Sequence, residues 1–364
     1  MTGAGEDAER FARLRLLRSA HVGPVTWRQL IARFGDAQAA LEALPMLAGR
    51  GGGKPRIADT AAVQREMAAV DRLGARYLFL GDADYPPLLA ELESAPPALI
   101  VRGDVALAQR SCVAMVGARN ASAAACRFAR QIAQGLAQEG VTVVSGLARG
   151  IDTASHVGSL SGGTIGVIAS GIDIAFPPEN AELQERVASE GLLLAEQPPG
   201  TEPLARFFPS RNRIIAALSL GTVVVEAAPR SGSLITARIA AEAGREVMAV
   251  PGSPLDPRAQ GCNLLIREGA TLIQNVDDIL EAIRPIDLRA VREPGAGYSG
   301  PPPEDADDAD RARIAGLLGP VPVPVDELIR QSGLVPGVVQ TVLLELELAG
   351  RLERHGGGRV SLTR

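Results

Sequence analysis

Lysine, histidine and cysteine are scarce in this 364-residue sequence. Lys54 is the single lysine among 37 basic residues, a bias that genome composition explains as readily as selection for guanidinium chemistry. The three cysteines are an odd number without CxxC spacing, and with three histidines they offer no metal-ligand cluster. We therefore expect no metal, no cofactor and a reducing compartment.

Long apolar runs and an excess of positive charge are also absent. No run of about 18 apolar residues occurs, and the N-terminal stretch MTGAGEDAERFARLR has no apolar segment of signal-peptide length. These absences predict a soluble, cytoplasmic protein that does not enter a membrane. The 37 basic and 42 acidic residues give a net charge of -5, so any polyanion site must be a local patch.

The N-terminal part of the chain, residues 1–74, is predicted to form a small helical domain. Apolar residues recur at helical spacing between residues 10 and 44, and the pattern is interrupted at Val22-Gly23-Pro24. The interruption is typical either of a helix-hairpin-helix (or SAM-like) turn, whose amides can approach a phosphate, or of a plain connection between helices. The stretch Gly49-Arg50-Gly51-Gly52-Gly53 predicts a flexible connector.

The central part, residues 75–284, alternates short apolar runs with helical patterns. The runs are CVAMVG, VTVVSG, TIGVIAS, LLLAE, GTVVVEA, EVMAVPG and ATLIQ. Strands that are apolar throughout are buried on both faces, which indicates a parallel sheet covered by helices. The sequence therefore predicts an α/β domain with a Rossmann-like, doubly wound, mostly parallel sheet.

The C-terminal part is predicted to contain a disordered linker and a winged helix. Residues 285–307 are rich in Pro, Gly and acid, with too little apolar surface to fold. Residues 308–364 follow the order helix, helix-turn-helix, hairpin, which is typical of a winged helix. Its third helix carries Glu345 and Glu347 and no basic residue before Arg351. We therefore expect a protein contact or a lapsed DNA-reading role for it.

The loops that follow the predicted strands carry the candidate chemistry, since ligands of open α/β sheets bind beyond the carboxyl ends of the strands. Four segments there combine glycine, arginine and hydroxyl groups: VGAR, SGLARGID, FFPSRNRII and RSGSLITA. Glycines let backbone amides approach an oxyanion, helix N-termini favour negative charge, and arginines supply forked donors. Their convergence at one sheet edge predicts an anion-binding site.

The arginines of the third segment admit two interpretations. Ser210 is the expected N-cap of a helix, which would place Arg211 and Arg213 in its first turn, where a cation opposes the helix dipole unless an anion lies nearby. Alternatively, the arginines of the site form ion pairs within the protein. The candidate partners for such pairs are Asp152, Glu196 and Glu226.

Asp152 and His156, one helical turn apart, could face each other near Ser145. Because Ser145 lacks a GxSxG elbow and no second acid is evident, we expect no catalytic residues. Asp152 is expected to cap the helix, and His156 to be packed or hydrogen-bonded. Three aromatic residues of the loops can either stack on bases or pack in the core: Phe176, Phe207 and Phe208.

Six stretches taken together resemble the DNA-processing protein A (DprA/Smf) family over roughly residues 75 to 283. They are VGAR, VVSGLARGIDTASH, GGTIGVIASGIDIAFP, FPSRNRIIAALS, VVVEAAPRSGSLITARIAAEAGREVMAVPG and GCNLLIREGA. The flanking domains also resemble that family's optional terminal modules. The resemblance implies a homodimer that binds single-stranded DNA without sequence preference, displaces single-strand-binding protein and loads the RecA recombinase during natural transformation. The family is not known as an enzyme class.

Carried over motif by motif, the resemblance also implies a set of DNA-binding residues. One departure concerns Phe176-Pro177-Pro178-Glu179, because some members of the family have a basic residue after Tyr-Pro. A backbone contact is then missing, or is supplied by Arg206 or Arg230. The implied set is Gly117, Arg119, Ser145, Gly146, Arg149, Gly150, Arg211, Asn212, Arg213, Ser231, Gly232 and Thr236.

The alternative from another class is a nucleotide-processing enzyme, because related folds include phosphoribohydrolases. Those enzymes carry a PGGxGT-type loop with a catalytic Glu. The nearest counterpart in this chain is Arg230-Ser231-Gly232-Ser233, which has no carboxylate. The sequence therefore favours the DNA-binding interpretation.

Overall fold

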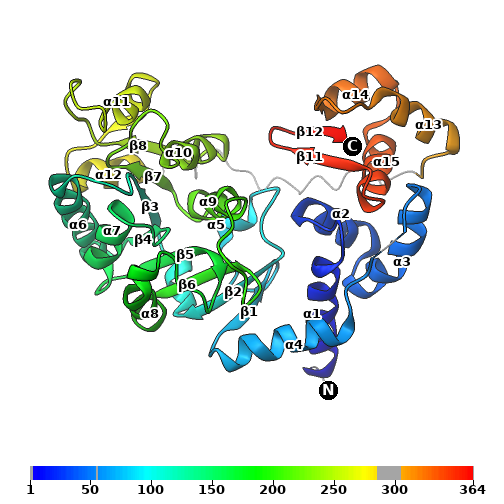
Figure 1. Cartoon of the computed structure of the whole chain (residues 1–364), viewed down its shortest axis with the longest axis horizontal. Helices are drawn as coiled ribbons and strands as arrows, with labels where there is room; N and C mark the ends of the chain where they lie inside the picture. Colours follow the sequence, from blue (N-terminus) through cyan, green and yellow to red (C-terminus); the bar gives the residue numbers. More distant parts are fainter. Residues whose placement is uncertain (1–2, 55, 285–304, 364) are drawn as a thin grey trace. The chain divides into compact units, whose positions relative to one another are not determined.

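The computed structural model describes residues 3–54, 56–284 and 305–363 (Figure 1). The chain divides into two compact units, one formed by residues 1–65 together with 289–364 and the other by residues 66–288. Most of the predicted disordered linker, residues 285–304, lies outside the described residues. Among the described helices, none is both long and apolar enough to cross a membrane.

The unit of residues 66–288 is built on a mostly parallel sheet, which confirms the predicted α/β class. The strand order is β1-β2-β6-β5-β4-β3-β7-β8-β9. Strands β3 to β9 run parallel to their neighbours, whereas β2 pairs antiparallel with β6, and β1 pairs antiparallel with β2. The bounds are β1 Arg76–Phe79, β2 Ala98–Gly103, β3 Cys112–Val116, β4 Thr142–Ser145, β5 Thr164–Gly171, β6 Leu192–Gln197, β7 Gly221–Val224, β8 Glu246–Ala249 and β9 Thr271–Leu272.

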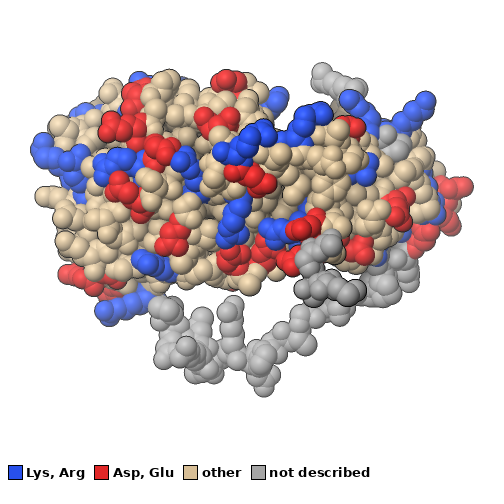
Figure 2. Space-filling view, turned by 90° about the horizontal axis from the view of Figure 1, so that it is seen from below, with Lys and Arg blue, Asp and Glu red and all other residues tan. Residues whose placement is uncertain are grey.

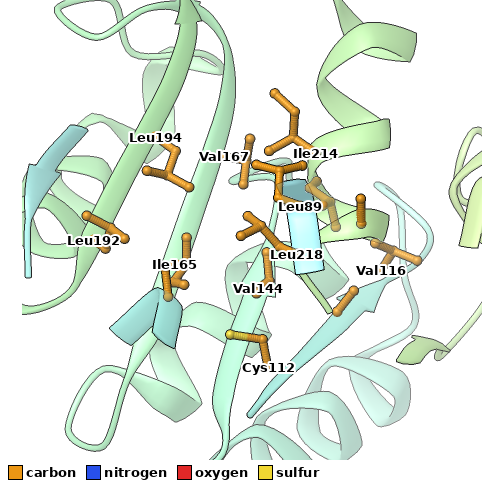
Figure 3. Packing of buried hydrophobic residues seen from close by; sticks show 14 of the residues in the cluster. Leu89, Cys112, Val116, Val144, Ile165, Val167, Leu192, Leu194, Ile214 and Leu218 are labelled. Carbon is orange, nitrogen blue, oxygen red and sulfur yellow. The ribbon is translucent and has the colours of Figure 1, made fainter. Parts of the chain in front are cut away.

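Helices cover both faces of this sheet, as a doubly wound fold requires. Along β3, Cys112 and Ala114 enter one hydrophobic core, and Val113 and Met115 enter the other, because successive side chains of a strand point to opposite faces. Figure 3 shows part of the first core, where residues of β5 and β6 pack together with Ile214. The first core includes residues of α5 Pro87–Ala90, α9 Phe207–Ala217, α10 Ser233–Glu242 and α11 Gln260–Arg267, and the second includes residues of α6 Ala123–Gln138, α7 Ile151–Ser159 and α12 Val276–Ile283. Helix α8 Ala181–Glu190 packs against β2, β5 and β6.

The strand order reverses at β3, which lies between β4 and β7. Strands β4, β5 and β6 extend to one side of β3, and β7, β8 and β9 extend to the other. In doubly wound sheets a crevice opens at such a reversal, outside the carboxyl ends of the strands. The loops that follow β3, β4 and β7 meet at this crevice.

The other unit contains the predicted N-terminal helices, α1 Gly3–Arg18, α2 Pro24–Phe34 and α3 Ala37–Arg50, whereas α4 Thr60–Arg72 continues into the unit of residues 66–288. The indole of Trp27, on α2, is buried and donates a hydrogen bond from Nε1 to the carbonyl of Arg13 at 3.2 Å. The prediction of a flexible connector at residues 49–53 is wrong. Gly49 and Arg50 belong to α3, and the amide of Gly53 donates to the carbonyl of Ala48 at 2.9 Å, so the glycines end a helix in a tight turn.

The same unit contains the predicted winged helix. Its helices are α13 Asp308–Leu317, α14 Val325–Ser332 and α15 Pro336–Leu348, and its strands are β10 Val323–Pro324, β11 Leu352–His355 and β12 Arg359–Leu362. The strands form an antiparallel sheet in the order β10-β12-β11. Residues 305–307 were assigned to the linker from sequence, but Ala306 is buried, and Asp307 caps α13 by accepting from the amide of Asp310. The acidic composition that indicated disorder here serves a helix cap.

Candidate nucleic-acid interface

A groove of about 750 Å³ lies at the carboxyl ends of β3 and β7, where the strand order reverses. The loop after β3, helix α9 and the start of α10 line it. A smaller cavity of about 60 Å³ shares Arg119, Phe208 and Arg211 with the groove. The predicted residues that line the groove are Gly117, Arg119, Arg211, Asn212, Ser231, Gly232 and Thr236, and Gly146 and Arg149 line the smaller cavity.

Three predicted residues line neither cavity and instead belong to the surrounding framework. The hydroxyl of Ser145 is buried and donates to the carbonyl of Met115 at 2.6 Å. Gly150 has a φ of 76°, and a Cβ there would lie 2.3 Å from the carbonyl oxygen of Ala118. This glycine therefore lets the loops after β3 and β4 pack together. Arg213 forms a partly buried ion pair with Glu196, as the internal-pairing interpretation proposed.

Helix α9 begins earlier than the sequence suggested. It starts at Phe207 with Arg206 in the N-cap position, so the prediction of Ser210 as N-cap is wrong. Pro209 falls in the first turn, where a missing backbone N–H breaks no helical hydrogen bond. Because of this start, Arg211 lies beyond the first turn and is freed from the most unfavourable part of the helix dipole.

Arg211 lies at the bottom of the site and is only 6% exposed. Its Nη1 donates to the carbonyl of Val167 at 3.0 Å, while its Nε is buried with no partner among the described residues. A Cβ on Gly146 would lie 1.5 Å from Nη1, so the guanidinium occupies the space that glycine leaves open. Burial, with the nearby charge of Arg119, lowers the pKa of Arg211 to about 10, against the opposing attraction of Asp152. The guanidinium therefore stays charged at neutral pH.

Asp152 organises the loop after β4. Its carboxylate accepts from the amides of Gly146 at 3.1 Å and Ala148 at 3.3 Å, and burial raises its pKa, although Arg211 and these amides oppose the rise. It does not cap α7, whose N-cap is Gly150, so the predicted capping role is wrong. The carboxylate instead supports the loop around Leu147, which has a φ of 54°.

Asn180 holds the same loop from the other side, a role that the sequence pattern does not indicate. Its buried side-chain amide donates to the carbonyl of Leu147 at 2.8 Å and to Oγ1 of Thr153 at 2.9 Å. An Asn directly before a helix indicates an N-cap, and Asn180 does occupy that position of α8, but its side chain caps nothing there. It therefore joins the segment that follows Phe176 and Pro177 to the loop that carries Arg149.

Aromatic and basic groups meet between the two cavities. The guanidinium carbon of Arg119 lies 5.4 Å from the ring centroid of Phe208, and that of Arg211 lies 5.9 Å from it. Phe176 contacts Phe208 edge to face at 5.9 Å and is 40% exposed. Arg119 is exposed and forms no ion pair with any other described residue. This arrangement offers two positive charges and an accessible ring to a ligand.

Helix α10 presents its N-terminus to the groove. Gly232 is the N-cap and has no side-chain cap, and the hydroxyls of Ser231 and Ser233 are hydrogen-bonded to each other at 2.7 Å. The amides of Leu234 and Ile235 donate to the carbonyls of Ser231 and Gly232, so the attraction for an anion here comes from the positive end of the helix dipole and from the hydroxyls. Ser231, Gly232 and Thr236 therefore line an end of the groove suited to a phosphate oxygen.

A family model described as "DNA recombination-mediator protein A" matches residues 76–284, which include all of these residues. The chain belongs to this family. Models of the DprA-like N-terminal HHH domain and the DprA winged helix domain match residues 7–69 and 299–358. The match to the HHH domain favours the helix-hairpin-helix interpretation of Val22-Gly23-Pro24 over a plain connection between helices. The match to the winged helix domain confirms the predicted winged helix.

Curated and solved proteins agree with this membership. The chain is 34% identical to Protein Smf of Synechocystis sp. over an alignment of 378 residues, gaps included, and the alignment covers 93% of this chain and 95% of that protein. The solved DprA structure from Streptococcus pneumoniae has a TM-score of 0.58 at 42% identity and covers 62% of this chain and 78% of that one. A Helicobacter pylori DprA structure has a TM-score of 0.52 at 28% identity, covering 56% and 94% of the two chains, and is described as giving insights into that protein's unique single-stranded DNA binding mode.

The net charge of -5 predicts that a binding site for a polyanion is a local patch of basic residues and not an extended positive surface. On the face shown in Figure 2, basic and acidic side chains are interspersed and no surface of one sign extends across it. Glu179, the acidic residue after Pro177-Pro178, lies 3.6 Å from Arg149, but both side chains are exposed, so the pair is weak. Arg230 is exposed and lines the groove.

The geometry does not assemble a catalytic triad from the candidates. Nδ1 of His156 is hydrogen-bonded to Oγ1 of Thr164 at 2.7 Å, while the Ser145 hydroxyl donates to a backbone carbonyl. Burial, with the charge of Arg211, lowers the pKa of His156 to about 3, so the ring is neutral. His156 is thus a packed, hydrogen-bonded residue, as predicted. Among the described residues, no cluster of His, Cys, Asp or Glu suits a metal ion.

Proposed function

We propose that this protein binds single-stranded DNA without sequence preference and acts in DNA recombination. The observation that carries the proposal is the pair Arg119 and Arg211, two guanidinium groups that face the same groove and share one nearby carboxylate, that of Asp152, with which neither forms an ion pair among the described residues. Two positive charges beside a single carboxylate leave an excess of positive charge, which a bound anion would stabilise. A phosphate of a nucleic-acid backbone is an anion of the right geometry for forked donors.

The other groups at the groove support contact with the backbone rather than with base edges. Guanidinium groups, helix N-terminal amides and hydroxyls bind phosphate oxygens, which carry no sequence information. The exposed ring of Phe176 is accessible to an unstacked base, whereas the bases of a duplex are paired and stacked. We therefore propose single-stranded DNA rather than duplex as the ligand, with bases tolerated and not read.

The salt dependence of binding tests this proposal. With about three phosphates neutralised, log K for a dT oligonucleotide should fall against log[salt] with a slope near -2, at roughly -0.7 per phosphate. Replacing both Arg119 and Arg211 by Ala should weaken filter binding of all sequences alike and flatten the slope. Arg186→Ala is the matched control, because Arg186 is half exposed and pairs with Glu190 on α8, away from the groove. Salt-independent affinity would contradict a backbone clamp.

The proposal extends to the partners that the family resemblance implies. A homodimer in the cytoplasm would protect the strand, displace single-strand-binding protein and deliver the strand to RecA. Sedimentation of the protein tests whether it is a dimer. RecA filament formation on DNA coated with single-strand-binding protein tests whether it delivers the strand to RecA. Release of free base from nucleoside monophosphates would instead favour the phosphoribohydrolase alternative.

A further inference from the structure

Helix α15 occupies the position of the helix that reads a DNA groove in helix-turn-helix domains. Such a helix needs exposed side chains to reach bases and phosphates. From Val338 to Leu348, however, no residue of α15 is exposed. Gln340 and Glu347 are half-buried, and all the others are buried. From Val338 onward the helix therefore has no free face that could enter a groove, and its exposed first turn offers only Pro336.

One side of α15 packs in the core of the winged helix, where Val339 and Leu343 join Ile314 and Leu328. Another side packs against α3 of the same compact unit (Figure 1).

The contact between these helices is a close backbone approach at two glycines. A Cβ on Gly51 would lie 2.1 Å from the carbonyl oxygen of Glu345, and a Cβ on Gly53 would lie 2.6 Å from Cα of Ala349. Neither glycine has a positive φ, so their lack of a side chain serves this contact and not a special backbone conformation. Gly49, in the same stretch, has nothing within 4 Å of its Cβ position.

A charge cluster accompanies the glycine contact. Glu345 is 1% exposed, and its carboxylate accepts from Nε and Nη2 of Arg311 at 2.8 and 3.0 Å. Arg50, from the N-terminal helices, reaches the same cluster: its Nη1 lies 2.9 Å from Asp305 and 3.8 Å from Glu345. A buried carboxylate in a DNA-reading helix would repel phosphate, whereas here it is paired with arginines from both sides of the contact.

We propose that the winged helix of this protein is a docking module whose partner is the chain's own N-terminal helical segment, and that α15 does not read duplex DNA. The proposal is independent of the groove in the other unit. It assigns Gly51 and Gly53 to a close interface, and Arg50 to recognition of Asp305 and Glu345. Acidic groups on the winged helix and a basic group on the N-terminal helices make the two surfaces complementary in charge.

Alanine substitutions at neighbouring glycines provide a matched test in the full chain. A specific protease site is inserted within residues 290–300, the chain is cut, and the fragments are separated by size exclusion. Wild-type and Gly49→Ala fragments should co-elute at the mass of one chain. Gly51→Ala and Gly53→Ala fragments should separate, because one methyl group at either position collides with a rigid helix. Separation of the wild-type fragments would overturn the proposal.

Charge variants and DNA binding keep the test independent of any misfolding. Arg50→Glu should separate the fragments, because it places a further carboxylate beside Asp305 and Glu345, whereas Arg50→Lys, which keeps the positive charge, should leave them together. Uncut Gly51→Ala protein should bind a 20-base-pair duplex no more tightly than the wild type does. A tenfold gain in duplex affinity would overturn the proposal, because it would show that docking conceals a DNA-reading helix.

Discussion

Gly146 and Arg211 share one small volume, because the guanidinium lies where a Cβ of residue 146 would be. Gly146→Ala should therefore displace Arg211 and weaken binding of single-stranded DNA by about tenfold to a hundredfold, equivalent to about 1–3 kcal/mol of coupling. In an Arg211→Ala background, the same substitution should add little, since it acts through the guanidinium. Filter binding of the two single variants and the double variant measures the coupling. Additive effects would show that Gly146 contributes a backbone contact of its own.

His156 makes stability depend on pH, because burial lowers its pKa in the folded protein to about 3 from the usual 6.5. The unfolded chain binds a proton below pH 6.5 and the folded chain does not, so stability is lost as the pH falls from 6.5 towards 3. Between pH 7 and 5 the wild type should lose about 2 kcal/mol more than His156→Gln, at about 1.4 kcal/mol per pH unit below 6.5. Urea unfolding at both pH values tests this. The contribution of Asp152 to the pH dependence cancels in this comparison, because both proteins carry it. Equal losses of stability in the two proteins would contradict the lowered pKa of His156.

At the scale of elements, the short helix Pro178–Asn180 and the loop after β4 depend on one side chain. Asn180→Ala should leave every basic residue in place but remove the hydrogen bond to the carbonyl of Leu147. The backbone of Leu147 should then leave its positive φ for a less strained conformation. We expect affinity for single-stranded DNA to fall by roughly tenfold, as expected for a lost buried hydrogen bond of about 1–2 kcal/mol, with an unchanged salt slope. Salt titrations of the variant and of the Arg186→Ala control measure both quantities. A flatter slope would mean that Asn180→Ala also removes a phosphate contact.

Most strands of the main sheet and the loops that follow them are predictable from sequence, because buried strands and their loops obey local rules. The apolar runs from β3 to β9 specify a parallel sheet, and the rule for carboxyl ends brings Arg119, Arg149 and Arg211 to one edge. The apolar run of β2 was missed, although it has the same signal. The start of α9 was misplaced because Ser210 is a residue type that favours the N-cap position. The roles of Asn180 and Phe208 depend on contacts with segments far away in the sequence, which no local pattern encodes. Asp152 contacts only its own loop, but its residue type fits a helix cap equally well.

At the scale of the whole molecule, the two compact units predict a division of labour. Residues 66–284 contain both hydrophobic cores of the main sheet and every residue of the groove. This fragment should fold alone and bind a dT oligonucleotide within about threefold of the full chain, because a domain with its own core keeps its site. Calorimetric melting and filter binding measure the two properties. A tenfold loss of affinity would mean that the other unit supplies DNA contacts.

Trp27 gives this molecule an internal reporter that belongs to one unit alone. It is the only tryptophan of the chain, and its buried indole lies among the N-terminal helices, far in sequence from every loop of the groove. Exciting the indole therefore reports on the N-terminal helices, and its emission shifts to the red when they unfold and water reaches the ring. Loss of the helical far-ultraviolet signal follows both units together. Unfolding followed by the two signals in parallel resolves the order in which the units melt, with no label attached.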